Sequence, residues 1–182
     1  MKLFVTMTVL LLGWIPLAGQ SVAVSTNAVD YANKCTLNVE ASLGIARRWS
    51  LNAGVKYNPF SYGAGESESF SKQRACGVGA RFWPWHIYSG WWFGGKGQYQ
   101  EYSICGGSDP STREGDRYGI GLAVGYSKML GRHINLDFGL GAWTGYSTYT
   151  VYACQHCGRI IENGSRAFLL PNDILLAVSY IF

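Results

Sequence analysis

The C-terminal run Leu175–Phe182 is the sequence feature that most constrains the fold. Its residues alternate, with Leu176, Val178, Tyr180 and Phe182 on one face, and this is the period-2 pattern of a β-strand. A strand that ends on a large aromatic residue is typical of the last strand of a bacterial outer-membrane barrel. There, a terminal aromatic and another two residues before it direct insertion. We therefore interpret Tyr180 and Phe182 as an insertion signal.

The same alternation recurs along the chain and predicts eight strands. The clearest example is 118–127, where Tyr118, Ile120, Leu122, Val124 and Tyr126 alternate with glycine, alanine and serine. The weakest is the first segment. The expected strands are 21–29, 37–45, 49–58, 75–82, 87–102, 118–127, 134–142 and 175–182.

Composition and the N-terminal segment both favour an exported membrane protein. Lys2 precedes an apolar stretch, Leu3–Ala18, which is the pattern of a secretory signal peptide. We expect a signal peptide at 1–19 and one domain at 20–182. Charged residues make up 14% of the chain, against about 25% in a typical soluble domain. No later segment has the ~18 consecutive apolar residues of a membrane helix.

The fold class follows from these observations. Membrane-crossing strands must form a closed sheet, because open strand edges are not tolerated in lipid. We therefore predict an all-β fold, an eight-stranded antiparallel up-and-down transmembrane β-barrel. The connections 46–48, 84–86 and 130–132 are short, whereas 61–71, 103–116 and 153–167 are longer and polar. This asymmetry predicts periplasmic turns and termini at one end and extracellular loops at the other.

The direction of the alternation predicts a polar interior. The more apolar face must meet lipid, so the other face points into a space that eight strands leave just wide enough to fill with side chains. Large inward groups are expected at Trp92 and Trp143. We favour a structural polar core over an ion path, with charged members that must be paired. This predicted lumen network comprises Glu40, Lys56, Arg81, Lys96 and Asp137.

Aromatic residues near the predicted strand ends suggest interfacial girdles. They are Trp49, Tyr57, Phe60, Trp83, Trp85, Tyr99, Tyr102 and Tyr118.

The cysteines leave three interpretations open. Cys154 and Cys157 flank His156 in the last long loop. A redox centre would need a βαβ setting, which the pattern lacks. A metal site recruiting His156, Cys35 and Cys105 lacks a second Cys-x-x-Cys. A local disulfide that stiffens an extracellular loop is the interpretation that we favour, because that compartment is oxidising. Cys76 is expected to face lipid as a small apolar residue.

Several of these segments resemble a known family. Asn38–Glu40, Trp49–Leu51, Tyr57–Phe60 and Tyr152–Gly158 are similar to segments of an uncharacterised family of small outer-membrane barrels from Gram-negative bacteria. The resemblance covers nearly the whole mature chain. It implies a barrel in the outer membrane and no particular activity. Some relatives accompany surface-fimbria genes, which implies a role in surface assembly or adhesion.

The sequence favours a non-catalytic function. His86 and His133 fall at the short turns and His156 stands beside two cysteines, so no histidine has a clear partner for acid–base chemistry. We expect a surface binding or assembly factor without cofactor. The alternatives are a purely structural barrel and a lipid-modifying outer-membrane enzyme. Expected partners are outer-membrane lipid, lipopolysaccharide, the insertion machinery and a surface protein. A net charge of +4 is too mild and scattered for nucleic acid.

Overall fold

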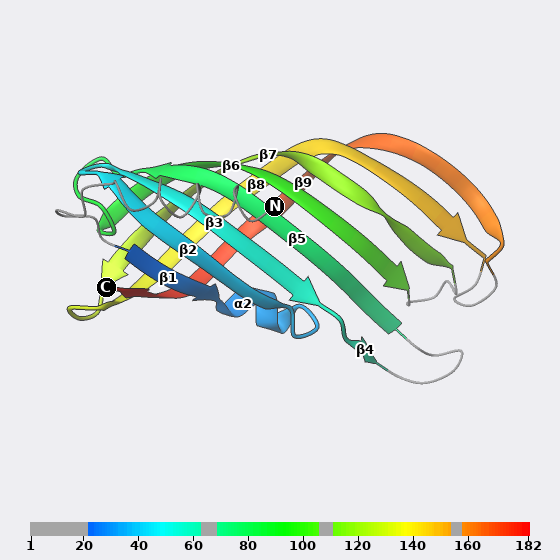
Figure 1. Ribbon diagram of the computed structural model, residues 1–182, viewed down its shortest axis with the longest axis horizontal. Helices are drawn as coiled ribbons and strands as arrows, with labels where there is room; N and C mark the ends of the chain where they lie inside the picture. Colours follow the sequence, from blue (N-terminus) through cyan, green and yellow to red (C-terminus); the bar gives the residue numbers. More distant parts are fainter. Residues whose placement is uncertain (1–21, 63–68, 106–110, 154–157) are drawn as a thin grey trace, which may run out of the picture.

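The computed structural model describes residues 22–62, 69–105, 111–153 and 158–182, which form an all-β structure with one short helix (Figure 1). Among these residues, no helix is long and apolar enough to cross a membrane. The elements are β1 Val22–Asn27, α2 Ala28–Ala32, β2 Leu37–Ala46, β3 Trp49–Asn58, β4 Ser61–Tyr62, β5 Ser69–Phe82, β6 Gly90–Cys105, β7 Thr112–Met129, β8 Ile134–Tyr152 and β9 Ile160–Ile181.

Eight of these strands close into a ring. Apart from β3 and β4, consecutive strands pair antiparallel; β1 also pairs with β9, and β3 pairs with β5. The ring comprises β1, β2, β3, β5, β6, β7, β8 and β9, while β4 pairs only with the start of β5. Ser25 pairs with Ser179, but following paired residues the other way round the ring returns to β9 at Phe168. This offset is the stagger that tilts strands in a closed sheet.

The strands differ greatly in length. β1, β2 and β3 have 6, 10 and 10 residues, whereas β7, β8 and β9 have 18, 19 and 22. Strands β5 to β9 run well past α2 at the end opposite the C-terminus (Figure 1). The ring therefore has one short side, capped by α2, and one tall side, which we call the upper wall (residues 112–118 of β7, 146–152 of β8 and 160–168 of β9).

Each of the eight expected segments coincides with part of one strand of the ring. The expected segments 37–45 and 49–58 lie in β2 and β3. Along these strands, more exposed and less exposed side chains alternate, as the apolar and polar residues do. Leu122 is 76% exposed on the outer face, while its neighbour Ala123 lines the interior. The prediction of an apolar outer face and a more polar inner face is therefore confirmed for these strands.

The strand ends differ from the prediction. Much of the expected loops 61–71, 103–116 and 153–167 is strand, because β5 begins at Ser69, β7 at Thr112 and β9 at Ile160. These extensions carry polar residues on both faces, so they show no hydrophobic alternation. The first segment ends at Asn27, whose side chain caps α2 by accepting from the Val29 amide at 3.3 Å. The fifth begins at Gly90, after a turn with positive φ at Tyr88 and Gly90.

Two of the expected girdle residues point inward instead. Trp83 is 1% exposed and donates from Nε1 to the Ser50 hydroxyl at 3.1 Å. The Tyr102 hydroxyl lies inside the upper wall, 3.1 Å from that of Ser147. The other six expected girdle side chains are exposed, while their place at a membrane interface stays a prediction.

Candidate functional site

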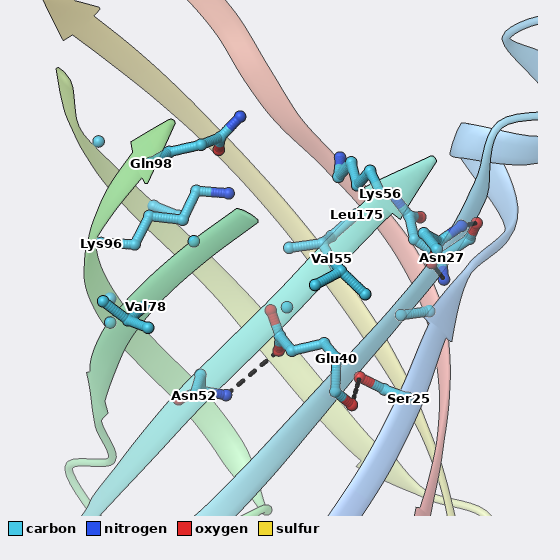
Figure 2. Close-up of a pocket in the computed structure, with 18 of the residues that line it drawn as sticks. Ser25, Asn27, Glu40, Asn52, Val55, Lys56, Val78, Lys96, Gln98 and Leu175 are labelled. Carbon is cyan, nitrogen blue, oxygen red and sulfur yellow. Dashed lines mark hydrogen bonds between the residues drawn. The ribbon is translucent and has the colours of Figure 1, made fainter. Parts of the chain in front are cut away.

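The interior of the ring holds a cavity of about 90 Å³ that is lined by side chains from both sides (Figure 2). Lys96 and Gln98 extend into it from β6, and Glu40 and Lys56 approach from β2 and β3. A second space of about 190 Å³ adjoins it toward α2 and shares Asp30, Lys56 and Gln98 with it. The two spaces together lead from the middle of the ring toward α2.

An ion pair occupies the part of this cavity nearer the short turns. Arg81 on β5 and Glu40 on β2 are 2.6 Å apart, and the Asn52 amide donates to the same carboxylate oxygen at 3.2 Å. The guanidinium of Arg81 also lies over the Trp92 ring, 4.5 Å from its centroid. A charge held away from water needs such partners. Two of the five residues of the predicted lumen network are thus in direct contact.

A second ion pair lies at the end of the cavity nearer α2. Lys56 on β3 contacts Asp30 on α2 at 2.9 Å. The 5-residue helix is positioned by Asn27, whose side-chain nitrogen donates to Asp30 Oδ2 at 3.2 Å. Asp30 was missed by sequence reasoning, because a helix this short has no periodic signature. Lys96 lines the same cavity as Glu40, Lys56 and Arg81.

Asp137 lies apart from the rest of the predicted network. It is buried on β8, outside both cavities, and accepts hydrogen bonds from Ser127 and Ser179. Asn135 donates to Ser127 at 3.2 Å and to the Tyr88 carbonyl at 2.6 Å. Strand parity placed Asp137 inside the ring, where it is buried. Parity gives the facing of a residue but not its height along the strand, so it did not predict that Asp137 lies outside the cavity that the other four residues line.

Aromatic rings fill the interior at the short-turn end. Trp83 packs against Tyr88 and Trp92, with ring centroids 5.6 and 6.4 Å away. The indole of Trp92 is accommodated by Gly125, where an added Cβ would lie 2.4 Å from Cζ2. Burial raises the pKa of the Tyr88 phenol, whose hydroxyl lies 3.0 Å from that of Ser42. The cavity therefore has an aromatic floor, and its mouth lies toward α2.

A comparison with protein-family models gives the relationship of the chain. The model of a protein of unknown function (DUF3575) matches residues 5–182. The chain belongs to this family. A search of curated proteins gave no match to it. The expectation of an uncharacterised family is confirmed, while the outer-membrane location that the resemblance implies stays a prediction.

The cysteine predictions for this DUF3575 chain concern three residues outside the described part and three within it. Cys154, His156 and Cys157 lie outside the described residues. Of the cysteines that are described, Cys35 and Cys76 are exposed and Cys105 is buried. No group of three metal-ligating side chains occurs in residues 22–62, 69–105, 111–153 and 158–182.

The two described histidines of the DUF3575 chain bind backbone atoms. His86 Nδ1 lies 3.1 Å from the Ile87 carbonyl oxygen, and His133 Nδ1 lies 2.8 Å from that of Ile181.

The interior of the ring combines ion pairs, amides and aromatic rings, an arrangement suited to holding a polar ligand.

Proposed function

We propose that this protein is a non-catalytic outer-membrane β-barrel whose extracellular end binds a component of the cell surface. The observation that carries the proposal is a pair of aromatic belts on the outer face, separated by a span without charged side chains. The barrel would stand with its short turns and termini in the periplasm and its upper wall outside the cell.

The two belts are equally spaced on three neighbouring strands. Eight residues separate Trp91 from Tyr99 on β6, Tyr118 from Tyr126 on β7, and Phe138 from Tyr146 on β8. All six side chains are exposed. Eight residues span about 26 Å along a strand, or roughly 20 Å along the axis at a tilt of about 40°. This is close to the apolar band of about 25 Å in outer-membrane barrels.

The span between the belts is apolar and solvent-accessible in the isolated chain. Its outward residues on these three strands are Phe93, Gly95, Gly97, Ile120, Leu122, Val124, Leu140, Ala142 and Thr144. Ile120, Leu122 and Leu140 are 70%, 76% and 64% exposed. An apolar surface of this extent would be costly in water, where contiguous exposed patches of a monomer rarely exceed a few hundred Å². Contact with lipid would remove that cost.

The terminal aromatics lie just beyond the belt nearer the short turns, because Tyr180 pairs with Ile134, four residues before Phe138. Tyr180 stacks on His133 with centroids 5.6 Å apart, and Phe182 packs edge-on against Tyr180 at 4.9 Å. Both rings are exposed, so they could be read by insertion machinery before the ring closes. We propose that Tyr180 and Phe182 form the insertion signal, and that outer-membrane lipid and lipopolysaccharide surround the belts.

The interior supports binding rather than conduction. The aromatic floor of Trp83, Tyr88 and Trp92 fills the ring near the short turns, while the cavity extends toward α2. A structural barrel would need neither the cavity nor the tall upper wall. The surface partner, whether a protein or a glycan, would bind to this wall.

Localisation and orientation can be tested together in the native host. The five cysteines are replaced by alanine, and one cysteine is introduced at Thr148 in the upper wall or at Arg132 in a short turn. We expect the protein in the outer-membrane fraction, with heat-modifiable mobility on gels. A membrane-impermeant maleimide should label T148C, and not R132C, on intact cells. Recovery in a soluble fraction, or labelling of R132C alone, would refute the proposal.

A further inference from the structure

The inner face of the upper wall carries three arginines. Arg117 on β7 pairs with Ser147 on β8, which pairs with Arg166 on β9. The two arginines are therefore two strands, or about 10 Å, apart. Arg113 lies four residues before Arg117 on the same face of β7, about 13 Å along the strand. None of the three lines the cavity below.

Aromatic rings hold these guanidinium groups. Arg117 lies over the Tyr102 ring at 3.9 Å from its centroid. Arg113 and Arg166 lie over the ring of Tyr149, at 5.3 and 5.5 Å. Stacking of this kind orients the planar group and leaves its N–H edge available for a ligand.

The arginines of the upper wall differ from the cations of the cavity in their partners. Arg81 and Lys56 each contact a carboxylate. Arg113, Arg117 and Arg166 form no ion pair within the described part of the chain. Glu162, the carboxylate beside them on β9, accepts instead from the Tyr149 hydroxyl at 2.6 Å. Three cations set against one carboxylate create a positive field on this face.

On the cavity side of Arg117, the inner face of the wall carries glycines on β7 and β8, with Phe168 of β9 beside them. Gly119 and Gly145 pair with each other, and an added Cβ on either would lie 2.0 Å from a backbone oxygen of the opposite strand. Gly115 lies on the same face, beside Tyr149. Ring faces, hydroxyls and open backbone suit a flat polar ring better than they suit peptide side chains, which need pockets.

We propose that the upper wall binds an acidic polysaccharide. Its carboxylates would pair with Arg113, Arg117 and Arg166 through bidentate hydrogen bonds. Its sugar rings would lie on the glycine-lined surface beside the aromatic rings. This inference deepens the proposed function, on which it rests for the orientation of the wall toward the outside of the cell. The phosphates of lipopolysaccharide would lie against the outer face, at the level of the lipid, and not on this inner face.

The test uses the full chain refolded in detergent micelles and isothermal titration with polygalacturonate oligomers. Dextran is the neutral saccharide, poly-L-glutamate the acidic peptide and purified lipopolysaccharide the phosphorylated lipid. The variant R117Q/R166Q removes two wall arginines. R47Q/R132Q is the matched control, because it removes the same charge from exposed positions at the short-turn end. Heat-modifiable mobility verifies the fold of each variant.

We expect the wild type and the control to bind polygalacturonate and not dextran, and added salt to weaken the binding. R117Q/R166Q should bind at least about tenfold more weakly, since one charge-assisted hydrogen bond alone contributes that much. Equal binding by R117Q/R166Q, no binding by the wild type, or equal or tighter binding of poly-L-glutamate or lipopolysaccharide would overturn the inference. If a correctly inserted protein fails to bind, the inference fails, whereas failure to reach the outer membrane refutes the proposed function itself.

Discussion

Replacement of Leu122 by arginine tests whether the outer face meets lipid. Leu122 lies on β7, four residues from Tyr118 and four from Tyr126, and is therefore midway between the two belts. A cationic side chain at the bilayer midplane costs about 2–4 kcal/mol. If the same face met water, the exchange of an exposed leucine for arginine would change stability by about 0.5 kcal/mol or less. The two environments therefore predict clearly different results.

The assay is urea unfolding of the chain in phospholipid vesicles, followed by tryptophan fluorescence and by heat-modifiable mobility. Thr148→Arg is the matched control, because Thr148 is exposed on β8 beyond Tyr146 and should lose only about 0–1 kcal/mol. Ala123→Ser, one residue along and facing the cavity, should also be mild. Equal losses for Leu122→Arg and Thr148→Arg would refute the assignment of the membrane span.

Three further results are expected. Arg81→Ala should destabilise the protein by about 1–3 kcal/mol, which is less than the loss for a fully buried pair, because Glu40 remains 30% exposed. Adding Glu40→Gln to Arg81→Ala should recover part of that loss. A double mutant whose loss equals the sum of the two single losses would contradict the pairing. Gly125→Ala should cost about 1–3 kcal/mol, because the added Cβ would lie 2.2 Å from the Phe138 carbonyl oxygen and 2.4 Å from the Trp92 indole. Gly97→Ala, with open space around it, should cost little, and similar unfolding midpoints for the two variants would exclude this close packing. Deletion of residues 180–182 should leave exported protein that does not insert, and normal amounts of heat-modifiable protein in the outer membrane would rule out the insertion signal.

The sequence predicted those parts of the fold in which the two faces of a strand differ. β2 and β3 have bounds close to the predicted ones, because their apolar and polar residues alternate strictly. The extensions of β7 and β9 were assigned to loops, since polar residues on both faces remove the alternation. In these extensions the pairing of strands, which depends on neighbours distant in sequence, determines the structure.

The candidate site was only partly predictable for a similar reason. Strand parity placed Glu40, Lys56 and Arg81 inside the ring but could not give their partners, which depend on the strand register. Asp30 was missed because α2 has only 5 residues. Trp83 was placed at the membrane interface because it lies beside a turn. Its burial inside the ring of strands depends on how that turn folds inward, which the sequence pattern does not show.

The unequal strand lengths also have a consequence for association with other chains. β9 pairs with β1 only over 177–181, so in the described structure its stretch Ile160–Pro171 has β8 as its only strand neighbour. Such a free edge exposes a row of backbone donors and acceptors to any extended segment. Pro171, which has no N–H group, and the charged side chains of Glu162 and Arg166 interrupt this row. They would oppose uncontrolled strand addition, and hence aggregation, along the tallest part of the molecule.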